Sequence, residues 1–394
     1  MSSHTRCSVF GPSVIVVVSF LHSQNTVWVI SEVSLCSGSS SGSALMRSDC
    51  PTTGWCCLDW GLQLLAFLCC RGIGSSRKAK VGRSWLPREN RRILMWNCPK
   101  CQEEGSIAEG GLLGTEWSCV SCGHAVPVQD GIPCFAPELI DTMTGFDPKL
   151  FDTLVKFETT SFWFVMRARL LTTLLDQYFP SPRDFLEIGC GTGSVLRALQ
   201  QRFPQMRLTG SELHPHGLAY ARGRLGDQVT LLQMDARDIP ATGKFDVIGA
   251  FDVIEHIPED VAVLREIHSA LRPGGGVMIA VPQHPALWSP ADDAAFHQRR
   301  YERGELERKL EEVGFTILHT TSFNSLLLPL MILSRQKMLW NQRRGTKSDP
   351  LSEFKMPDWL NRALMMILGV EVQLTRAGVK WPVGGSRIVL AQRE

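Results

Sequence analysis

Residues 185–194, F-L-E-I-G-C-G-T-G-S, constrain the fold of this chain more than any other stretch. They predict a short buried strand, a glycine-rich turn and the start of a helix over residues 195–203. Gly189, Gly191 and Gly193 stand at alternate positions. Glycine allows positive φ angles, and it allows a close approach between backbone and ligand that a Cβ would prevent. We therefore expect a ligand to lie against this turn.

The residues around the turn indicate which ligand this is. Glu212 ends the next predicted strand, nineteen residues after Gly193, where a carboxylate can accept both hydroxyl protons of a ribose. A dinucleotide fingerprint would read G-x-G-x-x-G, whereas this turn reads G-x-G-x-G with Glu187 just before it. The additional carboxylate would repel a pyrophosphate and suits a ligand with an ammonium and a sulfonium. Asp235 ends the third predicted strand, where it can accept from an adenine amino group. The pattern therefore predicts S-adenosylmethionine (SAM).

Five stretches occur in the order and spacing of the consecutive motifs of class I SAM-dependent methyltransferases. They are L-E-I-G-C-G-T-G, S-E-L-H, Q-M-D-A-R-D-I-P, F-D-V-I-G-A-F-D-V-I-E-H and L-R-P-G-G-G-V-M-I-A-V-P. Over roughly residues 157–315 the chain resembles this family, and within it the small-molecule enzymes of methyltransferase type 11. The alternative is a nucleotide-binding fold of another kind. The resemblance implies a cofactor site made of Glu187, Gly189, Gly191, Gly193, Glu212, Leu213, Asp235, Ala236 and Phe251.

The rest of the chain divides into regions of different composition. With 394 residues it is long enough for two or three domains, and its net charge of +2 implies no general attraction to nucleic acid. We expect residues 1–94 to be disordered or an extension without a selected fold, so that the folded part begins at Met95. The alternative is a signal peptide or anchor, because residues 14–21 form an apolar run, although no clean cleavage site follows.

Cysteines in two pairs predict a zinc ribbon over residues 95–140. Cys98 and Cys101, then Cys119 and Cys122, have the C-x2-C…C-x2-C spacing of a structural site in which four thiolates surround one zinc ion. The following segment resembles the strand and turn that close zinc ribbons fused ahead of bacterial methyltransferases. His124 could replace one ligand, and Cys134 is expected to be a small core residue.

The predicted fourth strand, residues 245–251, delivers Asp252, Glu255 and His256 to the carboxyl edge of the sheet, where open α/β sheets bind ligands. We expect His256 to be the catalytic residue, a general base for an acceptor hydroxyl, because imidazole titrates near neutral pH. A packing or capping role is the alternative. The three side chains also resemble an acidic-acidic-histidine cluster linked to a divalent metal in quinone O-methyltransferases.

Other segments are expected to surround the acceptor. Helical periodicity predicts a helix over residues 146–179. Its string F-W-F-V-M-R-A-R resembles the helix that family members place over the cofactor, which implies that Trp163 and Arg167 could cover it; core packing of Trp163 is the alternative. A loop after the fifth strand offers candidates for acceptor contact, and for each of them singly a loop-stabilising hydrogen bond is the preferred alternative. Residues 323–382 form a predicted helical lid. The loop candidates are His284, Asp293, His297 and Arg300.

These features predict a doubly wound, Rossmann-like α/β domain over residues 141–394, with a seven-stranded sheet and a helical insertion before the last strand. The expected function is methyl transfer from SAM to an oxygen or carbon of a small-molecule or lipid-like acceptor. The alternatives are an RNA base methyltransferase that uses the ribbon, although nucleic acid is a poor match to the charge, and a non-catalytic SAM-binding assembly partner.

We expect a cytoplasmic protein with peripheral membrane contact, because cationic residues follow the apolar block 326–333. The alternative for that block is burial against residues 364–370.

Overall fold

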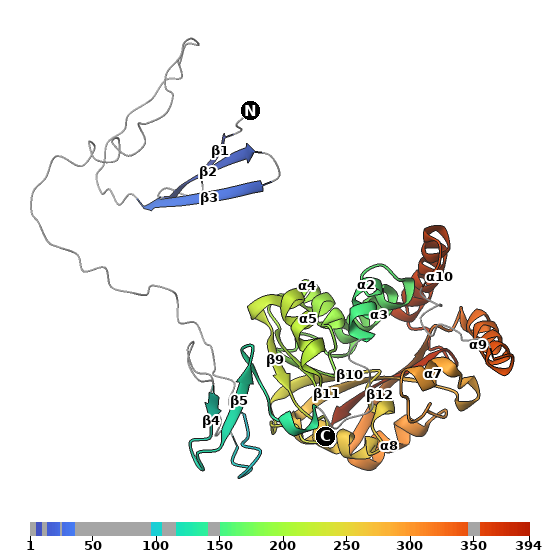
Figure 1. Ribbon diagram of the computed structural model, residues 1–394. Coiled ribbons are helices and arrows are strands. Elements are labelled where there is room, and N and C mark those ends of the chain that lie inside the picture. Colours follow the sequence, from blue (N-terminus) through green and yellow to red (C-terminus); the bar gives the residue numbers. More distant parts are fainter. Residues whose placement is uncertain are drawn as a thin grey trace, which may run out of the picture. The chain divides into compact units, whose positions relative to one another are not determined.

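The structure, a computed structural model, separates into two units, Met1–Trp85 and Leu86–Glu394 (Figure 1). It describes residues 5–9, 14–23, 26–35, 96–104, 116–140, 150–345 and 355–394. The first unit holds an antiparallel sheet of β1 (Thr5–Val9), β2 (Val14–Ser23) and β3 (Thr26–Leu35). The absence of a selected fold over residues 1–94 stays a prediction, because most of that range lies outside the described residues, as does Met95.

The second unit is built on the predicted seven-stranded sheet, whose strand order is β12-β13-β11-β10-β7-β8-β9. All described pairings are parallel except those of β13, which is antiparallel to both of its neighbours. The doubly wound α/β fold is therefore confirmed. The strands are β7 (Asp184–Ile188), β8 (Arg207–Glu212), β9 (Thr230–Gln233), β10 (Phe245–Phe251), β11 (Leu271–Pro282), β12 (Phe315–Phe323) and β13 (Ser386–Arg393).

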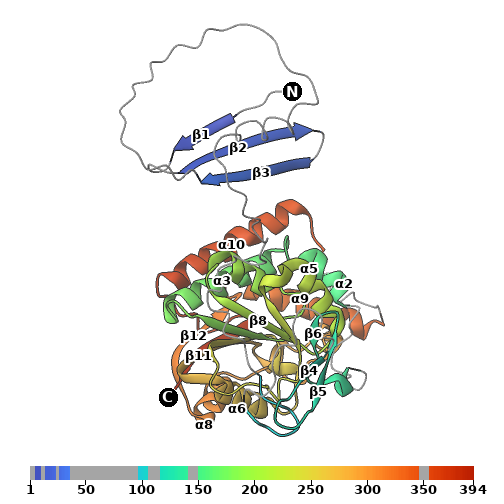
Figure 2. The same ribbon diagram turned by 90° about the vertical axis from the view of Figure 1, so that its left-hand side faces the viewer.

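Helices cover both faces of this sheet. In Figure 2, α3, α5 and α10 lie on one side of the strands, and α6 and α8 lie on the other. The predicted long helix over residues 146–179 is two helices, interrupted at residues 158–161, where Glu158 turns toward the cavity described below. The helices are α2 (Leu150–Phe157), α3 (Phe162–Tyr178), α4 (Ser194–Arg202), α5 (Pro215–Leu225), α6 (Asp260–Ala270), α7 (Pro290–Ala294), α8 (Glu305–Val313), α9 (Leu328–Arg343) and α10 (Asp358–Arg376).

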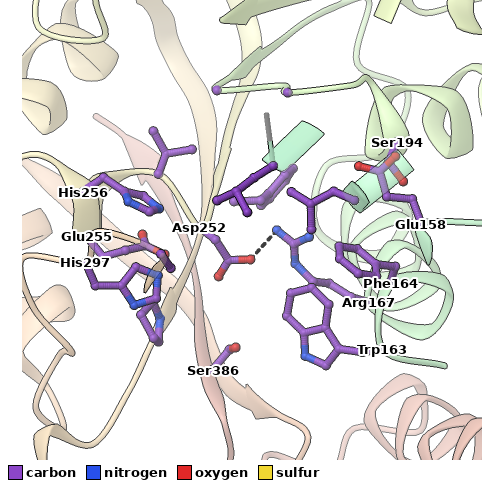
Figure 3. Close-up of a pocket in the computed structure, with 18 of the residues that line it drawn as sticks. Glu158, Trp163, Phe164, Arg167, Ser194, Asp252, Glu255, His256, His297 and Ser386 are labelled. Carbon is purple, nitrogen blue, oxygen red and sulfur yellow. Dashed lines mark ion pairs between the residues drawn. The ribbon is translucent and has the colours of Figure 1, made fainter. Parts of the chain in front are cut away.

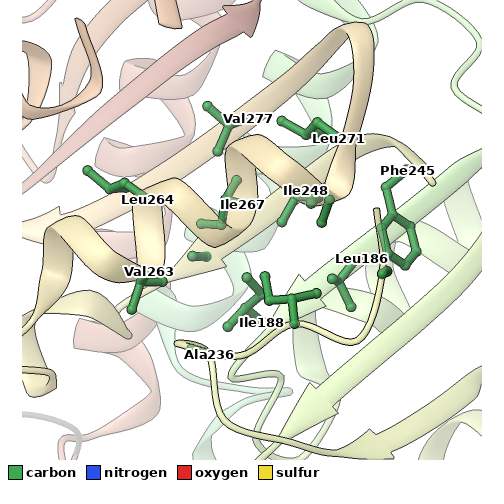
Figure 4. Packing of buried hydrophobic residues seen from close by; sticks show 14 of the residues in the cluster. Leu186, Ile188, Ala236, Phe245, Ile248, Val263, Leu264, Ile267, Leu271 and Val277 are labelled. Atoms are coloured by element: carbon green, nitrogen blue, oxygen red, sulfur yellow. The ribbon is translucent and has the colours of Figure 1, made fainter. Parts of the chain in front are cut away.

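The central strands are apolar on both faces because each face packs on helices. Successive residues of a strand point to opposite sides, so Leu186 belongs to the cluster around α6 and Phe185 to the cluster around α3 and α4. Figure 4 shows Ile267 of α6 beside Ile248. These buried strands hold their carboxyl ends rigidly, and the candidate site lies at those ends.

The cysteine-containing segment forms a small antiparallel sheet of β4 (Glu116–Ser118), β5 (Ala125–Gln129) and β6 (Ile132–Pro133). It is attached to the edge strand β9, because the backbone N–H of Phe135 donates to the carbonyl of Gln233 over 2.7 Å. The Gln233 amide also bonds to both backbone groups of Ala136. Cys134 is buried beside this junction, as expected of a small core residue.

The lid region contains α9 and α10, which lie at the same end of the second unit in Figure 1. Helix α10 packs on α3, where the Asn361 side chain bonds to the backbone N–H of Phe162 and the carbonyl of Thr160. The buried Glu371 carboxylate accepts from the backbone N–H groups of Ser325 and Leu326, just before α9. Both helices are therefore anchored at defined points. In the described part of the chain, no helix combines the length and the apolar character needed to cross a bilayer.

Candidate active site

A cavity of about 800 Å³ opens at the carboxyl ends of β7, β8 and β10. Its walls come from the glycine-rich turn and the strand ends on one side, and from α3, α9 and α10 on the other. Figure 3 shows His256, Glu255 and His297 across the cavity from Trp163 and Arg167. The cavity is therefore lined by residues that lie far apart in the sequence.

The glycine-rich turn has the predicted backbone conformation. Gly189, Gly191 and Gly193 have φ angles of 63°, 51° and 76°. A Cβ at Gly189 would lie 2.5 Å from a methyl carbon of Val253, and one at Gly193 would lie 2.8 Å from a methyl carbon of Leu225. These glycines are thus required by packing within the protein as well as by the approach of a ligand.

Glu212 is fixed against the turn. Its carboxylate accepts the backbone N–H of Gly191 over 3.1 Å and those of Leu213 and His214 over 2.8 and 3.1 Å. Burial raises the pKa of Glu212, and these hydrogen bonds oppose that shift. The carboxylate is held at the cavity wall, in the position that the sequence predicts for a ribose contact.

Two further carboxylates belong to this end of the cavity. Glu187 is 3% exposed, and burial raises its pKa to about 8, although the positive charge of Arg167 opposes the shift. Asp235 lines the cavity, and its carboxylate forms an ion pair of 2.9 Å with Arg237. The other residues predicted to contact SAM also line the cavity, except Gly193, which is not part of the lining; they are Gly189, Gly191, Leu213, Ala236 and Phe251.

Two ion-pair networks in the wall have no local signal in the sequence. Glu158 accepts from the Thr192 hydroxyl over 2.6 Å and pairs with Arg224 at 2.7 Å, which ties the break between α2 and α3 to the glycine-rich turn. Arg167 pairs with Asp252 at 2.6 Å (Figure 3). Only packing brings these partners together, because they are separated by tens of residues.

His256 lies in the cavity wall next to His297, with ring centroids 4.9 Å apart. Burial lowers the pKa of His256 to about 4, and the charge of His297 adds to the effect, so the imidazole is neutral at pH 7. Burial also raises the pKa of Glu255 well above its ordinary value. Glu255, His256 and His297 have ligand atoms within 4.8 Å of one another. Asp252, the third member of the triple named from the sequence, instead pairs with Arg167, and metal binding at this cluster stays a prediction.

The four loop candidates for acceptor contact separate into two pairs. His297 and Arg300 line the cavity, and both bond to the buried Asp292. His284 and Asp293 do not line it, and the Asp293 carboxylate instead accepts from the Trp288 indole N–H over 2.9 Å. Asp293 therefore makes the loop-stabilising hydrogen bond that was the alternative for these candidates, and acceptor contact by His284 and Asp293 stays a prediction that their positions do not favour.

The four paired cysteines converge at one point of the ribbon. Sγ of Cys98 lies 3.7 Å from Sγ of Cys122, and the same distance separates Cys101 from Cys119. Four sulfurs about 2.3 Å from one tetrahedral ion would lie about 3.8 Å apart, so the donors present fit a zinc ion. Gly123 (φ 71°) makes the turn after the second pair.

Part of this chain is similar in sequence to known proteins. Residues 163–320 match the family "Methyltransferase domain". The chain is 36% identical over 106 residues to a ubiquinone biosynthesis O-methyltransferase of Pseudomonas aeruginosa, covering 25% of this chain and 44% of that protein. It is 33% identical over 99 residues to a trans-aconitate 2-methyltransferase of Azoarcus sp., covering 25% of this chain and 39% of that protein.

Among solved structures, a phosphoethanolamine N-methyltransferase 2 of Haemonchus contortus, in complex with SAM, aligns with 19% identity and a TM-score of 0.39, over 57% of this chain and 52% of that chain. The chain spans less than half the length of the two curated relatives named above. Residues 163–320 therefore carry a methyltransferase domain of the class I, SAM-dependent type.

Proposed function

We propose that this protein transfers a methyl group from SAM to an oxygen or carbon of a small-molecule or lipid-like acceptor. The observation that carries the proposal is the single cavity of about 800 Å³, which joins the Glu212 end to the His256 end. A cavity of this size accommodates a cofactor and an acceptor together. The similarity to the ubiquinone and trans-aconitate methyltransferases supports a small-molecule acceptor.

In the proposed complex, the cofactor lies over the glycine-rich turn. Glu212 would accept from the ribose hydroxyls, Asp235 from the adenine amino group, and Glu187 would face the ammonium. Gly189 and Gly191 would allow the methionine portion to contact the backbone. In this arrangement the sulfonium methyl would point toward the half of the cavity that contains His256.

Methyl transfer is an in-line displacement in which the acceptor attacks the sulfonium methyl and S-adenosylhomocysteine leaves. With a hydroxyl acceptor, His256 would receive the proton of the O–H group as the new O–CH₃ bond forms. The pKa of about 4 keeps the His256 imidazole neutral at pH 7, but it also makes His256 a weaker base than the near-neutral imidazole expected from the sequence. The apolar wall excludes water, which removes solvation from the attacking oxygen.

RNA is a less suitable acceptor because the tryptophans in the described part of the ribbon are not accessible for stacking. The two tryptophans, Trp96 and Trp117, are buried, at 1% and 7% exposure. Trp96 packs against Phe245 of the methyltransferase domain, and the Lys244 ammonium lies 3.4 Å from its ring centre. Aromatic side chains that bind single-stranded bases must be accessible.

Product analysis tests the proposed function directly. Pure protein with isotopically labelled SAM would be incubated with separate lipid, quinone, small-metabolite and RNA extracts, and labelled products identified by mass spectrometry. We expect label in one of the first three extracts. Label in RNA alone would support the RNA alternative, and SAM binding without label in any extract would support the non-catalytic one.

For the ribbon we propose one structural zinc ion held by Cys98, Cys101, Cys119 and Cys122. Four thiolates complete the coordination and leave no position for a substrate. Elemental analysis should give about one zinc per chain, and Cys119→Ser should release it and unfold the ribbon. A metal-free protein with a folded ribbon would contradict this assignment.

We also propose that the outer surface of the lid contacts an anionic membrane. Leu333 and Trp340 of α9 are 62% and 52% exposed, and Trp359 and Met366 of α10 are 70% and 68% exposed. Within α9 there are basic but no acidic residues. Exposed tryptophans beside cations match the interfacial zone of an anionic bilayer, where each basic side chain contributes roughly 1 kcal/mol. By contrast, Leu327 is buried and Met331 lines the cavity. The apolar block 326–333 therefore contains both buried and exposed side chains.

A further inference from the structure

One ion pair lies between the two halves of the cavity, the cofactor half at Glu212 and the acceptor half at His256. Arg167 of α3 pairs with Asp252, the residue that follows β10, at 2.6 Å, and both residues line the cavity. Figure 3 shows the pair between the side of the cavity that holds His256 and the side that holds Trp163. A cofactor and an acceptor that fill the two halves would both lie next to this pair.

Arg167 is close to the cofactor half. Its positive charge opposes the rise in the pKa of the buried Glu187, the carboxyl expected to face the ammonium of SAM. Asp252 adjoins the glycine-rich turn through its neighbour Val253, since a Cβ at Gly189 would lie 2.5 Å from a methyl carbon of that valine. The ion pair therefore lies beside the part of the turn over which the methionine portion of SAM is proposed to bind.

Asp252 is also close to the acceptor half. Its negative charge adds to the effect of burial in raising the pKa of Glu255, which lines the cavity with His256. Of the Asp252 side chain, 26% is exposed, compared with 11% of the Arg167 side chain. The carboxylate therefore faces a site for the acceptor, while its charge is neutralised by an arginine beside the cofactor half.

The other two arginines in the described lining of the cavity lie at a different carboxylate. Arg300 Nε donates to Asp292 Oδ1 over 2.7 Å, and Arg335 of α9 lies 3.9 Å from Asp292 Oδ2. Arg167 is therefore the arginine beside the glycine-rich turn. The methionine portion of SAM ends in a carboxylate as well as an ammonium, and the N–H donors of a guanidinium match the two oxygens of a carboxylate.

We infer that Arg167 exchanges Asp252 for the carboxylate of SAM, and that Asp252, once freed, accepts a hydrogen bond from an O–H or N–H group of the methyl acceptor. This inference rests on the proposed methyl transfer and states how its two substrates are coupled. Because only 11% of the Arg167 side chain is exposed, the guanidinium has too little free surface to bind two carboxylates at once. The acceptor site is then complete only after the cofactor has bound, and it selects acceptors that carry a hydrogen-bond donor.

Two cofactor analogues test the exchange without methyl transfer. S-adenosylhomocysteine and S-adenosyl-3-thiopropylamine, which keeps the amine but lacks the carboxyl group, would be titrated by calorimetry into the full-length protein. The wild type should bind S-adenosylhomocysteine about fivefold more tightly than the amine analogue, because only the former can pair with Arg167. Arg167→Gln should bring the two affinities close together.

Asp252→Asn removes the competing carboxylate, so it should strengthen the binding of S-adenosylhomocysteine about three- to tenfold and leave that of the amine analogue nearly unchanged. Asparagine has nearly the shape of aspartate and tolerates the φ of 57° at this position. Asp252→Gly provides a second neutral variant if the asparagine side chain keeps a hydrogen bond to Arg167. Asp130→Asn, at an exposed ribbon position with a φ of 50°, is the matched control and should bind both ligands as the wild type does. Unchanged or weaker binding of S-adenosylhomocysteine in both Asp252 variants would overturn the exchange.

A phenol and its methyl ether test the role of Asp252 toward the acceptor. With S-adenosylhomocysteine bound, the wild type should bind 4-propylphenol about fivefold or more tighter than 4-propylanisole, in which a methyl group replaces the donor hydrogen. The preference should fall to about one in Asp252→Gly, and also in the wild type when the amine analogue replaces S-adenosylhomocysteine. Equal affinities in the wild-type complex with S-adenosylhomocysteine would overturn the contact between Asp252 and the acceptor. A wild type that binds neither cofactor analogue would instead count against the proposed function.

Discussion

The two halves of the cavity are built in different ways. In the cofactor half, the important groups follow the ends of β7 and β8, and the Glu212 carboxylate is held by backbone N–H groups of its own turn. In the acceptor half, side chains of α3 and α9 bond to side chains of distant segments, Arg167 to Asp252 after β10 and Arg335 to Ser289 just before α7. A site that is fixed by backbone leaves a local trace in the sequence, whereas a site that is fixed by side-chain pairs between distant elements does not.

The contrast between the two halves predicts that Glu212→Ala has the largest effect, which is a loss of SAM affinity. The variant should bind SAM on the order of a hundredfold more weakly, because two ribose hydroxyls lose a charged acceptor. Calorimetry with SAM measures the change, and Glu311→Ala on α8 is the exposed control. Since Glu212 also holds the backbone of Gly191, a melting curve must accompany the titration. Wild-type affinity in a folded Glu212→Ala protein would remove Glu212 from the cofactor site.

His256→Ala should affect turnover, which depends on the acceptor half, without affecting SAM binding in the cofactor half. Turnover of a hydroxyl acceptor should fall about a hundredfold, as expected on loss of a general base, while SAM affinity stays unchanged. The measurement is a labelled-methyl assay with the acceptor found by product analysis, and His216→Ala is a control at an exposed position. If turnover is unaffected, the packing or capping role of His256 is the correct one.

A smaller, pH-dependent effect is expected from Glu187. Its pKa of about 8 means that the carboxyl is mostly protonated in the free protein at pH 7. An ammonium bound beside it favours the ionised form, so binding releases a proton and SAM affinity should rise with pH, by up to about tenfold per unit, between pH 6 and 7.5. Calorimetry at several pH values measures this slope, and it should be flat in Glu187→Gln. A flat slope in the wild type would mean that Glu187 does not respond to the cofactor.

The smallest effect is expected at the outer surface of the lid. Leu333→Asp should lower co-sedimentation with anionic liposomes by a few-fold at low salt, because it places a negative charge among exposed apolar side chains. Val120→Asp, at a 77% exposed position in the ribbon, is the matched control. Cofactor binding should be the same in all three proteins. Wild-type protein that remains in the supernatant would show that the lid surface is not a membrane contact.

The same contrast explains what could be predicted from the sequence. The strand ends, the positive φ of Gly189 and the convergence of the four cysteines were all predictable, because each depends on residues close in the chain or on a fixed ligand spacing. The break at Glu158, the placement of Asp252 against Arg167 and the meeting of Arg335 with Asp292 were not. Each depends on how two helices pack, and no periodicity or motif records that geometry.

The position of β13 has a consequence for how the chain is made. This strand, Ser386–Arg393, lies between β11 and β12 and is the partner of both. A ribosome that adds about 5–20 residues per second completes every other strand of the sheet first. Until β13 emerges, β11 and β12 each present an open edge, and the apolar helices α9 and α10 have already been synthesised. The nascent protein thus passes through a stage in which strand edges and apolar helices are both exposed and can be bound by a chaperone. Insertion of β13 ends that stage.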